Sequence, residues 1–490
     1  MGSRRYRATR LLPIPPVPIL RARTFLYDYD LFVIGSGPAG QRAAIQGAKL
    51  GKRVAIAERK GSIGGGCINT GTIPSKTLRE AILNLVGERF GPTSSTIAMR
   101  EHVSMAELLG RAGQVIRNEV DVTRSQLLRN GIDMFTAEVA FADPHRLCLA
   151  FPDGLGERLV SAENIVIGTG TIATRDPAIP FDGEHVLTSE DILQMQHLPR
   201  TMAVVGAGVI GCEYASMFAA LGVRVTVIDK RPRLLPQIDE ELADTLVFHL
   251  RQKRVTFRLG EEVNRVLITA DERGPRVHIG LGSLKHVTVE SALYSIGRTG
   301  ATAGLNLPAA GLCADDRGNI AVNEQYQTAR PHIYAVGDVI GYPGLAATSM
   351  EQGRLAACNM FGVDHRSVPS LFPYGIYAIP EISMVGRTER ELTEAGVPYE
   401  VGKASYREIA RGQILGDETG MMKLLFHTDT RELLGVHIIG TGATELVHIG
   451  QAVMAFGGGV EYLVNTVFNY PTLAECYKTA ALDAANRLAA

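Results

Sequence analysis

A single cysteine in a glycine-rich segment is the first residue of this chain with redox chemistry. Residues 64–76 read GGGCINTGTIPSK and contain Cys67 as their only thiol. Thr72 stands where a second cysteine would complete a C-x4-C pair. Because a hydroxyl group cannot form a disulfide or store two electrons, electrons that reach this segment must leave by another route.

The other five cysteines are distant from Cys67 in the sequence. No two of the six form a C-x2-C or C-x4-C unit, and no zinc or iron–sulfur ligand spacing occurs, so no metal site is expected. Scattered thiols in a large protein favour a cytoplasmic location. The remaining cysteines are Cys148, Cys212, Cys313, Cys358 and Cys476.

An internal repeat at an offset of 171 residues contains the second set of candidate residues. Each copy has a short apolar strand, a G-x-G-x-x-G turn and an acidic residue 18 positions after the last glycine. The first copy provides Gly35, Gly37, Gly40 and Glu58, and the second provides Gly206, Gly208, Gly211 and Asp229.

This spacing is typical of a βαβ dinucleotide site. The first glycine forms the tight turn, the second lets a pyrophosphate approach the backbone, and the third lets the helix pack on the strand. The helix N-terminus then offers amides to the phosphates, and the acidic residue bonds a ribose hydroxyl. One such motif often marks only a tight turn, but two at equal spacing predict two dinucleotide-binding domains.

The length and composition of the chain predict a multidomain α/β protein. The chain has 490 residues, too many for a single core, with 46% hydrophobic residues and 53 glycines. Its net charge of −1 predicts neither nucleic-acid nor membrane-surface binding, and no apolar run reaches the roughly 18–20 residues of a membrane span. Alternating apolar segments at 422–426 and 434–439 predict an antiparallel sheet within a C-terminal α+β domain.

The combination of two nucleotide modules, one redox cysteine and a late Gly-Asp strand resembles the flavoprotein disulfide reductases. The resemblance covers residues 28–490 and is strongest to the soluble, flavin-dependent pyridine nucleotide transhydrogenases. It implies an α/β fold with two Rossmann-like dinucleotide-binding domains and a C-terminal α+β dimerisation domain. An FAD-binding domain is expected over 28–180 and 300–370, an NAD(P)-binding domain over 181–299, and the dimerisation domain over 371–490.

Residues 1–27 lie outside that resemblance. They contain six arginines, no acidic residue and a proline-rich stretch at 13–18. Because the prolines oppose the amphipathic helix of a transit peptide, we interpret this segment as a disordered extension or as the product of a start codon placed too early.

The resemblance also implies two nucleotide sites. In the FAD site Asp338 would accept hydrogen bonds from the sugar-like chain, and the helix that opens at residues 345–347 would present its N-terminus to the flavin. The residues assigned to FAD are Gly35, Gly37, Gly40, Glu58, Gly66, Thr169, Gly170, Gly337, Asp338, Leu345, Ala346 and Ala347. The residues assigned to NAD(H) and NADP(H) are Gly206, Gly208, Gly211, Asp229, Lys230, Arg231 and Gly297.

A charged pair and a basic loop are the candidates for chemistry and specificity. The resemblance places Lys76 and Glu213 side by side at the flavin, where the ammonium group polarises the nitrogen that accepts hydride. Asp229 favours the free hydroxyls of NAD, whereas the basic residues after it could meet the 2′-phosphate of NADP or form only a solvated loop. Those basic residues are Lys230, Arg231 and Arg233.

Two departures from the thiol-using members of the family occur together. Thr72 replaces their second cysteine, and Tyr470 replaces the histidine that would act as thiol base ahead of Glu475. Cys67 is then either a remnant that packs as a small apolar group or a reactive thiol. Tyr470 either lines the nicotinamide pocket or fills the space of the histidine. The resemblance implies that Tyr470 and Glu475 act in the site of a neighbouring subunit.

Reversible hydride transfer between NADPH and NAD+ through FAD is the activity that these residues predict. Because no disulfide is present to accept them, electrons stay on the flavin until a second nicotinamide nucleotide enters the same site. This order of events predicts ping-pong kinetics. Three alternatives stay open: an NAD(P)H oxidase or quinone reductase, a disulfide reductase of the dihydrolipoamide dehydrogenase type that uses Cys67, and a flavoprotein that binds NADH without turnover. A homodimer or a larger homo-oligomer is expected.

Overall fold

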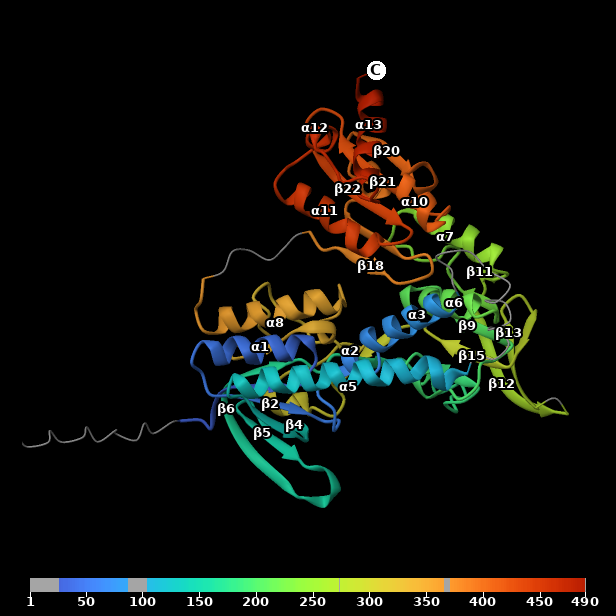
Figure 1. The fold of residues 1–490 in the computed structure, drawn as a ribbon. Helices are drawn as coiled ribbons and strands as arrows, with labels where there is room; N and C mark the ends of the chain where they lie inside the picture. Colours follow the sequence, from blue (N-terminus) through green and yellow to red (C-terminus); the bar gives the residue numbers. More distant parts are fainter. Residues whose placement is uncertain (1–25, 87–103, 273, 365–370, 490) are drawn as a thin grey trace, which may run out of the picture.

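The computed structural model describes residues 26–86, 104–272, 274–364 and 371–489 (Figure 1). The N-terminal extension expected over 1–27 therefore lies outside the described residues, except for Leu26 and Tyr27. Among the residues that the structure describes, none of the helices combines the length and the apolar character of a membrane span.

The first sheet is built from the first repeat and from the returning strand late in the chain. Its order is β3-β2-β1-β6-β5-β4, and β17 pairs with β6 in parallel. Helices α1 and α8 lie side by side against it, whereas β4 and β5 extend one edge as antiparallel strands (Figure 1). The strands are Tyr29–Ile34 (β1), Val54–Glu58 (β2), Asp133–Thr136 (β3), Glu138–Asp143 (β4), Arg146–Ala150 (β5), Glu157–Ile167 (β6) and Ile333–Ala335 (β17). The helices are Pro38–Lys49 (α1), Gly65–Asn69 (α2), Thr72–Val86 (α3), Met105–Arg129 (α5) and Ala346–Met360 (α8).

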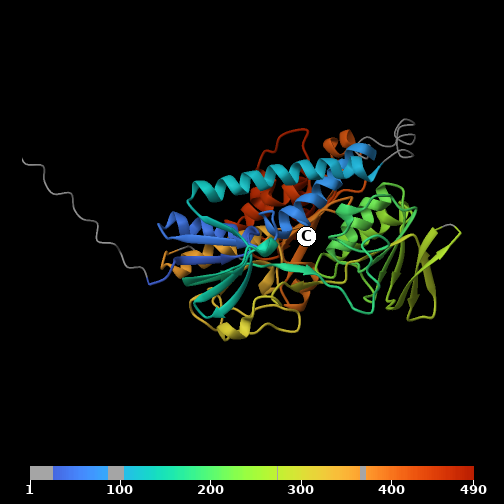
Figure 2. The same cartoon turned by 90° about the horizontal axis from the view of Figure 1, so that it is seen from below.

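The second sheet repeats the parallel arrangement in the order β11-β10-β9-β15-β8. It lies beside the first sheet, and a small antiparallel sheet, β12-β13-β14, forms its outer end (Figure 2). The parallel strands are Val186–Thr188 (β8), Thr201–Val205 (β9), Arg224–Asp229 (β10), Thr256–Leu259 (β11) and Ser291–Tyr294 (β15). The antiparallel strands and the helices are Val263–Asp271 (β12), Gly274–Leu281 (β13), His286–Val289 (β14), Val209–Ala220 (α6) and Glu240–Gln252 (α7).

The C-terminal unit is an antiparallel sheet of order β18-β19-β22-β21-β20 with helices packed on it. The two segments predicted to be antiparallel strands are β21 and β22, and they pair with each other. The strands are Tyr374–Ile376 (β18), Ile382–Gly386 (β19), Tyr399–Ser405 (β20), Met421–His427 (β21) and Leu433–Ile439 (β22). The helices are Glu389–Glu394 (α9), Ala410–Leu415 (α10), Ala443–Ala455 (α11), Val460–Asn465 (α12) and Glu475–Leu488 (α13).

Short elements complete the chain. Strands β7 (Thr171–Ala173) and β16 (Arg298–Gly300) pair where the chain passes to and from the second sheet. The 3-10 helices are Pro152–Gly154 (η1), Ile192–Gln194 (η2), Leu307–Ala310 (η3), Gly337–Ile340 (η4) and Tyr406–Glu408 (η5).

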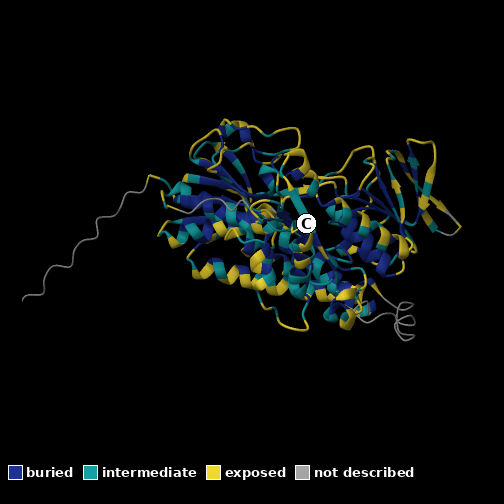
Figure 3. Ribbon diagram, turned by 90° about the horizontal axis from the view of Figure 1, so that it is seen from above, coloured by how far each residue is buried: buried dark blue, intermediate teal, exposed yellow. Residues whose placement is uncertain are grey.

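The buried core is continuous across the three units. Figure 3 shows the buried segments concentrated in the sheets and in the helix faces that cover them. One apolar cluster joins Leu78 and Ile82 of α3, Phe218 of α6 and Ile382 of β19, so it contains residues from all three units. Because apolar burial is the dominant favourable contribution to folding, this shared core fixes how the units sit against one another.

A buried ammonium group also ties the second unit to the third. Lys423 of β21 has a fully buried side chain, and its Nζ lies 2.9 Å from Asp239 and 2.6 Å from Glu389. Burial lowers the pKa of Lys423, but the hydrogen bonds and charges of Glu389 and Asp239 outweigh it, and the net pKa is raised. The group therefore stays charged, and its ion pairs hold the start of α7 against β21.

Replacing Lys423 with methionine should destabilise the protein by about 3–5 kcal/mol, because it leaves the buried Asp239 carboxylate without its cation. Lys403→Met is the matched control: Lys403 pairs with Glu241, but its side chain is 44% exposed, so its loss should cost less than about 1 kcal/mol. Guanidinium unfolding followed by circular dichroism measures both. Equal losses for the two variants would contradict the role assigned to Lys423.

Candidate active site

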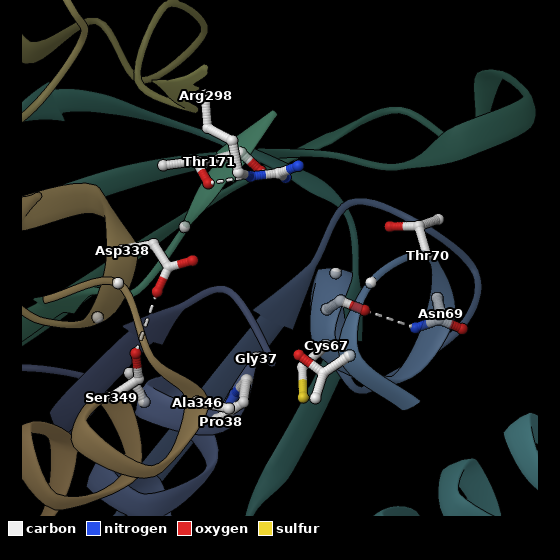
Figure 4. Close-up of a pocket in the computed structure, with 18 of the residues that line it drawn as sticks. Gly37, Pro38, Cys67, Asn69, Thr70, Thr171, Arg298, Asp338, Ala346 and Ser349 are labelled. Carbon is white, nitrogen blue, oxygen red and sulfur yellow. Dashed lines mark hydrogen bonds between the residues drawn. The ribbon is translucent and has the colours of Figure 1, made fainter. Parts of the chain in front are cut away.

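A cavity of about 720 Å³ lies at the carboxyl end of the first sheet, and residues of α6 also line it; Figure 4 shows part of its wall. Its wall combines the first glycine turn, the Cys67 segment, the Gly-Asp strand and the start of α8. Every residue assigned to FAD except Gly40 lines it, as do Cys67, Thr72, Lys76 and Glu213. The assigned residues from distant parts of the chain therefore share one cavity.

Two helices begin at this cavity. Helix α1 has Gly37 as its N-cap, and α8 has Leu345; neither cap side chain bonds the first-turn amides. Free amides and a positive dipole end at a helix N-terminus attract anionic groups. Asp338 accepts a hydrogen bond from the Ser349 hydroxyl (3.2 Å), and Figure 4 shows both near the N-terminal ends of α1 and α8.

The two glycine turns have the same geometry. A Cβ added at Gly40 would lie 1.9 Å from the carbonyl oxygen of Gly35, and one added at Gly211 would lie 1.9 Å from that of Gly206. Only glycine permits this close packing of helix on strand. A Cβ added at Gly37 or Gly208 would meet nothing within 4 Å, so the middle glycine of each turn faces open space. The three glycines of the second turn do not line the cavity, although Val209 and Ile210 of that turn do.

Glu58, at the end of β2, is hydrogen-bonded within the first turn. It accepts hydrogen bonds from the Ser36 hydroxyl (2.6 Å) and from the backbone amide of Lys60 (3.1 Å). The Ser36 oxygen in turn accepts a hydrogen bond from the amide of Gly64 (2.9 Å). The turn, the acidic residue and the Cys67 segment are therefore locked together before any ligand binds.

Cys67 and Thr72 are neighbours across the start of α3. The Thr72 side chain lies beside the Cys67 thiol and lowers its pKa, so Thr72 occupies the place of a second thiol. Burial raises the pKa of the Cys67 thiol, and the hydrogen bond to Thr72 offsets only part of the rise. All six cysteines lie within the described residues, and all six are free. These observations favour an inert, packed thiol over a reactive one.

Lys76 and Glu213 form an ion pair between α3 and α6. The Lys76 Nζ lies 2.9 and 2.7 Å from the two carboxylate oxygens of Glu213, which is buried. The backbone amide of Tyr377 donates a third hydrogen bond to Glu213 (2.8 Å), and the Tyr377 ring lies 4.8 Å from the ammonium group. The pair therefore joins the two nucleotide modules at the wall of the cavity.

The second acidic residue, Asp229, is not free. Arg231 donates to both of its carboxylate oxygens, from Nε (2.9 Å) and Nη2 (2.7 Å). Burial works against the charge of Asp229, but these bonds and those from the backbone amides of Ala207 and Arg231 hold its pKa below its ordinary value. Arg233 instead pairs with Glu240, and Lys230 is exposed. Gly297, with a φ of +148°, directly precedes β16.

Tyr470 and Glu475 lie away from the cavity of their own chain. The Tyr470 side chain is 75% exposed. Glu475 begins α13, and its carboxylate lies 3.4 Å from the amide nitrogen of Thr472, which donates to it. Within one chain, neither residue contributes to the site formed by Lys76 and Glu213.

Sequence reasoning missed two residues of the cavity wall. Arg298 donates hydrogen bonds to Thr171 Oγ1 (2.7 Å) and to Glu190 (3.2 Å), and it lies in the wall with both of them. Its position directly after Gly297 was the signal that could have found it. Tyr377 gave no such signal, because it lies 164 residues from Glu213 in the sequence.

This fold and site define a class, and the chain belongs to it: the pyridine nucleotide-disulphide oxidoreductases. The sequence model of this family matches residues 29–353, and that of its dimerisation domain matches residues 372–481. The matches confirm the predicted α/β fold class with its C-terminal dimerisation domain. They also support a homo-oligomer.

Soluble pyridine nucleotide transhydrogenases are among the most similar relatives. That of Mycobacterium tuberculosis (strain ATCC 25177 / H37Ra) is 53% identical over 467 residues, covering 94% of this chain and 98% of the relative. That of Colwellia psychrerythraea is 45% identical over 468 residues, covering 94% and 99%. The solved HOCl-induced flavoprotein disulfide reductase RclA from Escherichia coli has a TM-score of 0.82 at 28% identity, covering 93% of this chain and 99% of that chain. The predicted resemblance is confirmed.

FAD, the cofactor that the family assignment supports, fits the residues of the cavity. Thr169 Oγ1 is buried in the wall and has no hydrogen-bond partner among the described residues. The open space at Gly37 leaves room for a pyrophosphate at the start of α1. No group of three or more His, Cys, Asp or Glu side chains within the described ranges could hold a metal ion.

The half-buried Cys67 thiol should resist alkylation at about pH 7.5, because its raised pKa leaves little thiolate. Iodoacetamide followed by peptide mass spectrometry should label the exposed Cys313 at least about tenfold faster than Cys67. Labelling of Cys67 should become faster as the pH is raised, because more of its thiol is then ionised. Rapid labelling at neutral pH would contradict an inert thiol.

Proposed function

We propose that this protein catalyses reversible hydride transfer between NADPH and NAD+ through bound FAD. The observation that carries the proposal is the contact between Cys67 and Thr72: the place of the second thiol is filled by a hydroxyl. The relatives at 45–53% identity are named soluble pyridine nucleotide transhydrogenases, which supports the same activity. NAD(H) and NADP(H) are then substrates that use one site in turn.

Bound FAD would supply the two-electron acceptor and donor for hydride exchange between the two nicotinamide nucleotides. The start of α1 would hold its pyrophosphate, and Asp338 would accept hydrogen bonds from its sugar-like chain. The start of α8 would place backbone amides at the pyrimidine edge of the ring, where negative charge is stabilised. These residues bind and orient; none has to store electrons.

Lys76 and Glu213 would orient the hydride-accepting end of the ring. The buried carboxylate accepts three hydrogen bonds, two from the ammonium group and one from the Tyr377 amide. Such a group keeps one position and holds the ammonium charge in the cavity wall throughout the reaction. A fixed positive charge beside the ring favours the arrival of a hydride.

A disulfide reductase is the alternative that the geometry disfavours. It needs a second sulfur beside Cys67, and the neighbouring side chain is Thr72. The thiol base would also be lacking, because a tyrosine stands at position 470. A quinone reductase or oxidase would use the same flavin site, and the experiment below separates it from the proposed activity.

The assembly and the domain division belong to the proposal. We infer a homodimer in which Tyr470 and Glu475 complete the partner's site, because they lie outside their own cavity. The parallel strands of the first and second sheets support an FAD-binding domain over 28–180 and 300–370 and an NAD(P)-binding domain over 181–299; residues 371–490 would form the interface domain. The free cysteines favour the cytoplasm, and the net charge of −1 favours no nucleic-acid partner.

A two-step anaerobic titration tests the proposed activity. NADPH added to the FAD-loaded protein should bleach the flavin absorbance, and NAD+ added after removal of NADP+ should restore it with one NADH per FAD. Because the two nucleotides differ only at a remote phosphate, the reverse order should work equally well. Bleaching without recovery by NAD+, but with recovery by a quinone, would replace the proposal with a quinone reductase.

Replacing Lys76 with methionine should slow flavin bleaching by NADPH about 100-fold, because it removes the fixed charge at the hydride-accepting end. Stopped-flow absorbance measures the rate. Lys52→Met is the control, since Lys52 lies over the Phe361 ring and does not line the cavity. A Lys76→Met protein that keeps its FAD spectrum and bleaches at the normal rate would contradict this role.

A further inference from the structure

The loop after β10 contains three basic side chains, but they have different partners. Arg231 pairs with Asp229, and Arg233 pairs with Glu240, the first residue of α7. Lys230 is exposed and forms no ion pair within the described part of the chain. Arg231 is therefore the basic group held directly against the acidic residue of the second module.

The rest of this loop is fixed to the C-terminal unit. Arg390 of α9 donates a hydrogen bond to the carbonyl oxygen of Pro236 (2.7 Å), and Lys423 pairs with Asp239. Glu240 and Glu241 add pairs with Arg390 and Lys403. With its downstream end held at several points, the loop presents Asp229 and Arg231 from a defined backbone position.

The Asp229 carboxylate has no unused acceptor position. One oxygen accepts from the Ala207 amide (2.6 Å) and from Arg231 Nη2, and the other accepts from the Arg231 amide (2.8 Å) and from Arg231 Nε. A carboxylate accepts about four hydrogen bonds in total. A ribose hydroxyl can therefore reach Asp229 only after the Arg231 side chain has left.

The guanidinium group, by contrast, keeps free donors while it is paired. It has about five N–H donors, and Asp229 takes those of Nε and one of Nη2. Nη1 has no hydrogen-bond partner among the described residues, and the side chain is 42% exposed, compared with 5% for Asp229. Its outer edge is thus available to an anion without any break in the pair.

We propose that the Asp229–Arg231 pair is the element that lets one site accept both nucleotides: it stays closed for NADP(H) and opens for NAD(H). In the closed state Arg231 neutralises Asp229 and binds the 2′-phosphate with its outer edge. In the open state Arg231 swings into solvent, and Asp229 accepts the ribose hydroxyls. This inference rests on the proposed function, because it assigns both nucleotides to the second module.

The Asp229–Arg231 pair lies beside the second glycine turn, where the nucleotide would be recognised. Ala207, which donates to Asp229, lies between Gly206 and Gly208 of the second glycine turn. An unpaired Asp229 would repel a phosphate, and a permanently paired one would exclude the hydroxyls of NAD. NAD(H) loses part of its affinity, because the ion pair must open before it binds. NADP(H) escapes the charge repulsion of Asp229, because Arg231 neutralises the carboxylate. The two effects bring the affinities for the two nucleotides closer together.

Calorimetry with two redox-inert probes tests the proposal on the FAD-loaded protein. Adenosine 2′,5′-bisphosphate carries the extra phosphate, and adenosine 5′-monophosphate carries the free hydroxyls. Arg231→Gln should weaken the bisphosphate about 10- to 100-fold, because a charge-assisted contact is lost. The same variant should bind the monophosphate as tightly as the unmodified protein or more tightly, because Asp229 is uncovered.

Three variants accompany this measurement. Asp229→Asn should weaken the monophosphate and spare the bisphosphate. Arg233→Gln should change either affinity less than about twofold, because Glu240 holds that side chain. Arg224→Gln, at the opposite end of β10, controls for the loss of one positive charge. Equal weakening of both probes by Arg231→Gln, or the same pattern from Arg233→Gln, would overturn the proposal.

The outcome is separable from that of the proposed function. The rates at which NADH and NADPH bleach the flavin report the nucleotide preference of each variant. This measurement does not depend on reoxidation of the flavin. If NAD+ fails to reoxidise the unmodified protein, the transhydrogenase activity fails while the probe affinities still decide the role of Arg231. If transfer works but Arg231→Gln shows no change in preference, only the inference about the pair fails.

Discussion

One buried ion pair holds the reaction site together: Lys76 on α3 and Glu213 on α6 come from the two nucleotide modules. An uncompensated buried carboxylate is costly, so Glu213 requires the ammonium group at 2.7 Å and the Tyr377 amide at 2.8 Å. Through these contacts all three units meet at one point. The shared apolar cluster that runs from α3 to β19 supports the same geometry.

The Cys67 segment retains the framework of a thiol site without its second thiol. Its backbone is held to the first turn through Ser36, and Thr72 lies against the remaining sulfur. Burial disfavours the thiolate that a disulfide reaction would need. The segment thus closes one side of the cavity, and the proposed route for electrons runs between nucleotides that use one site in turn.

The C-terminal unit has more than an interface role in this arrangement. Its Lys423 and Arg390 hold the loop from Asp229 to α7, and Tyr377 supports Glu213. A match to a dimerisation domain therefore describes only part of its contribution. The buried charge of Lys423 on β21 and the exposed charge of Arg390 on α9 fix a loop whose own sequence, rich in charge and proline, would not hold one conformation.

The two dinucleotide modules could be predicted from the sequence, because strand, glycine turn and acidic residue are local features that recur at one spacing. The sequence also revealed the missing thiol, since Thr72 needs no fold to be recognised. The pairing of residues far apart in the chain was decided by the tertiary structure. Lys76 could be matched to Glu213 only by resemblance, and nothing in the sequence pointed to Tyr377, Arg390 or Lys423. Asp229 and Arg231 lie two positions apart, yet their pairing depends on side-chain directions and burial, which only the folded loop defines.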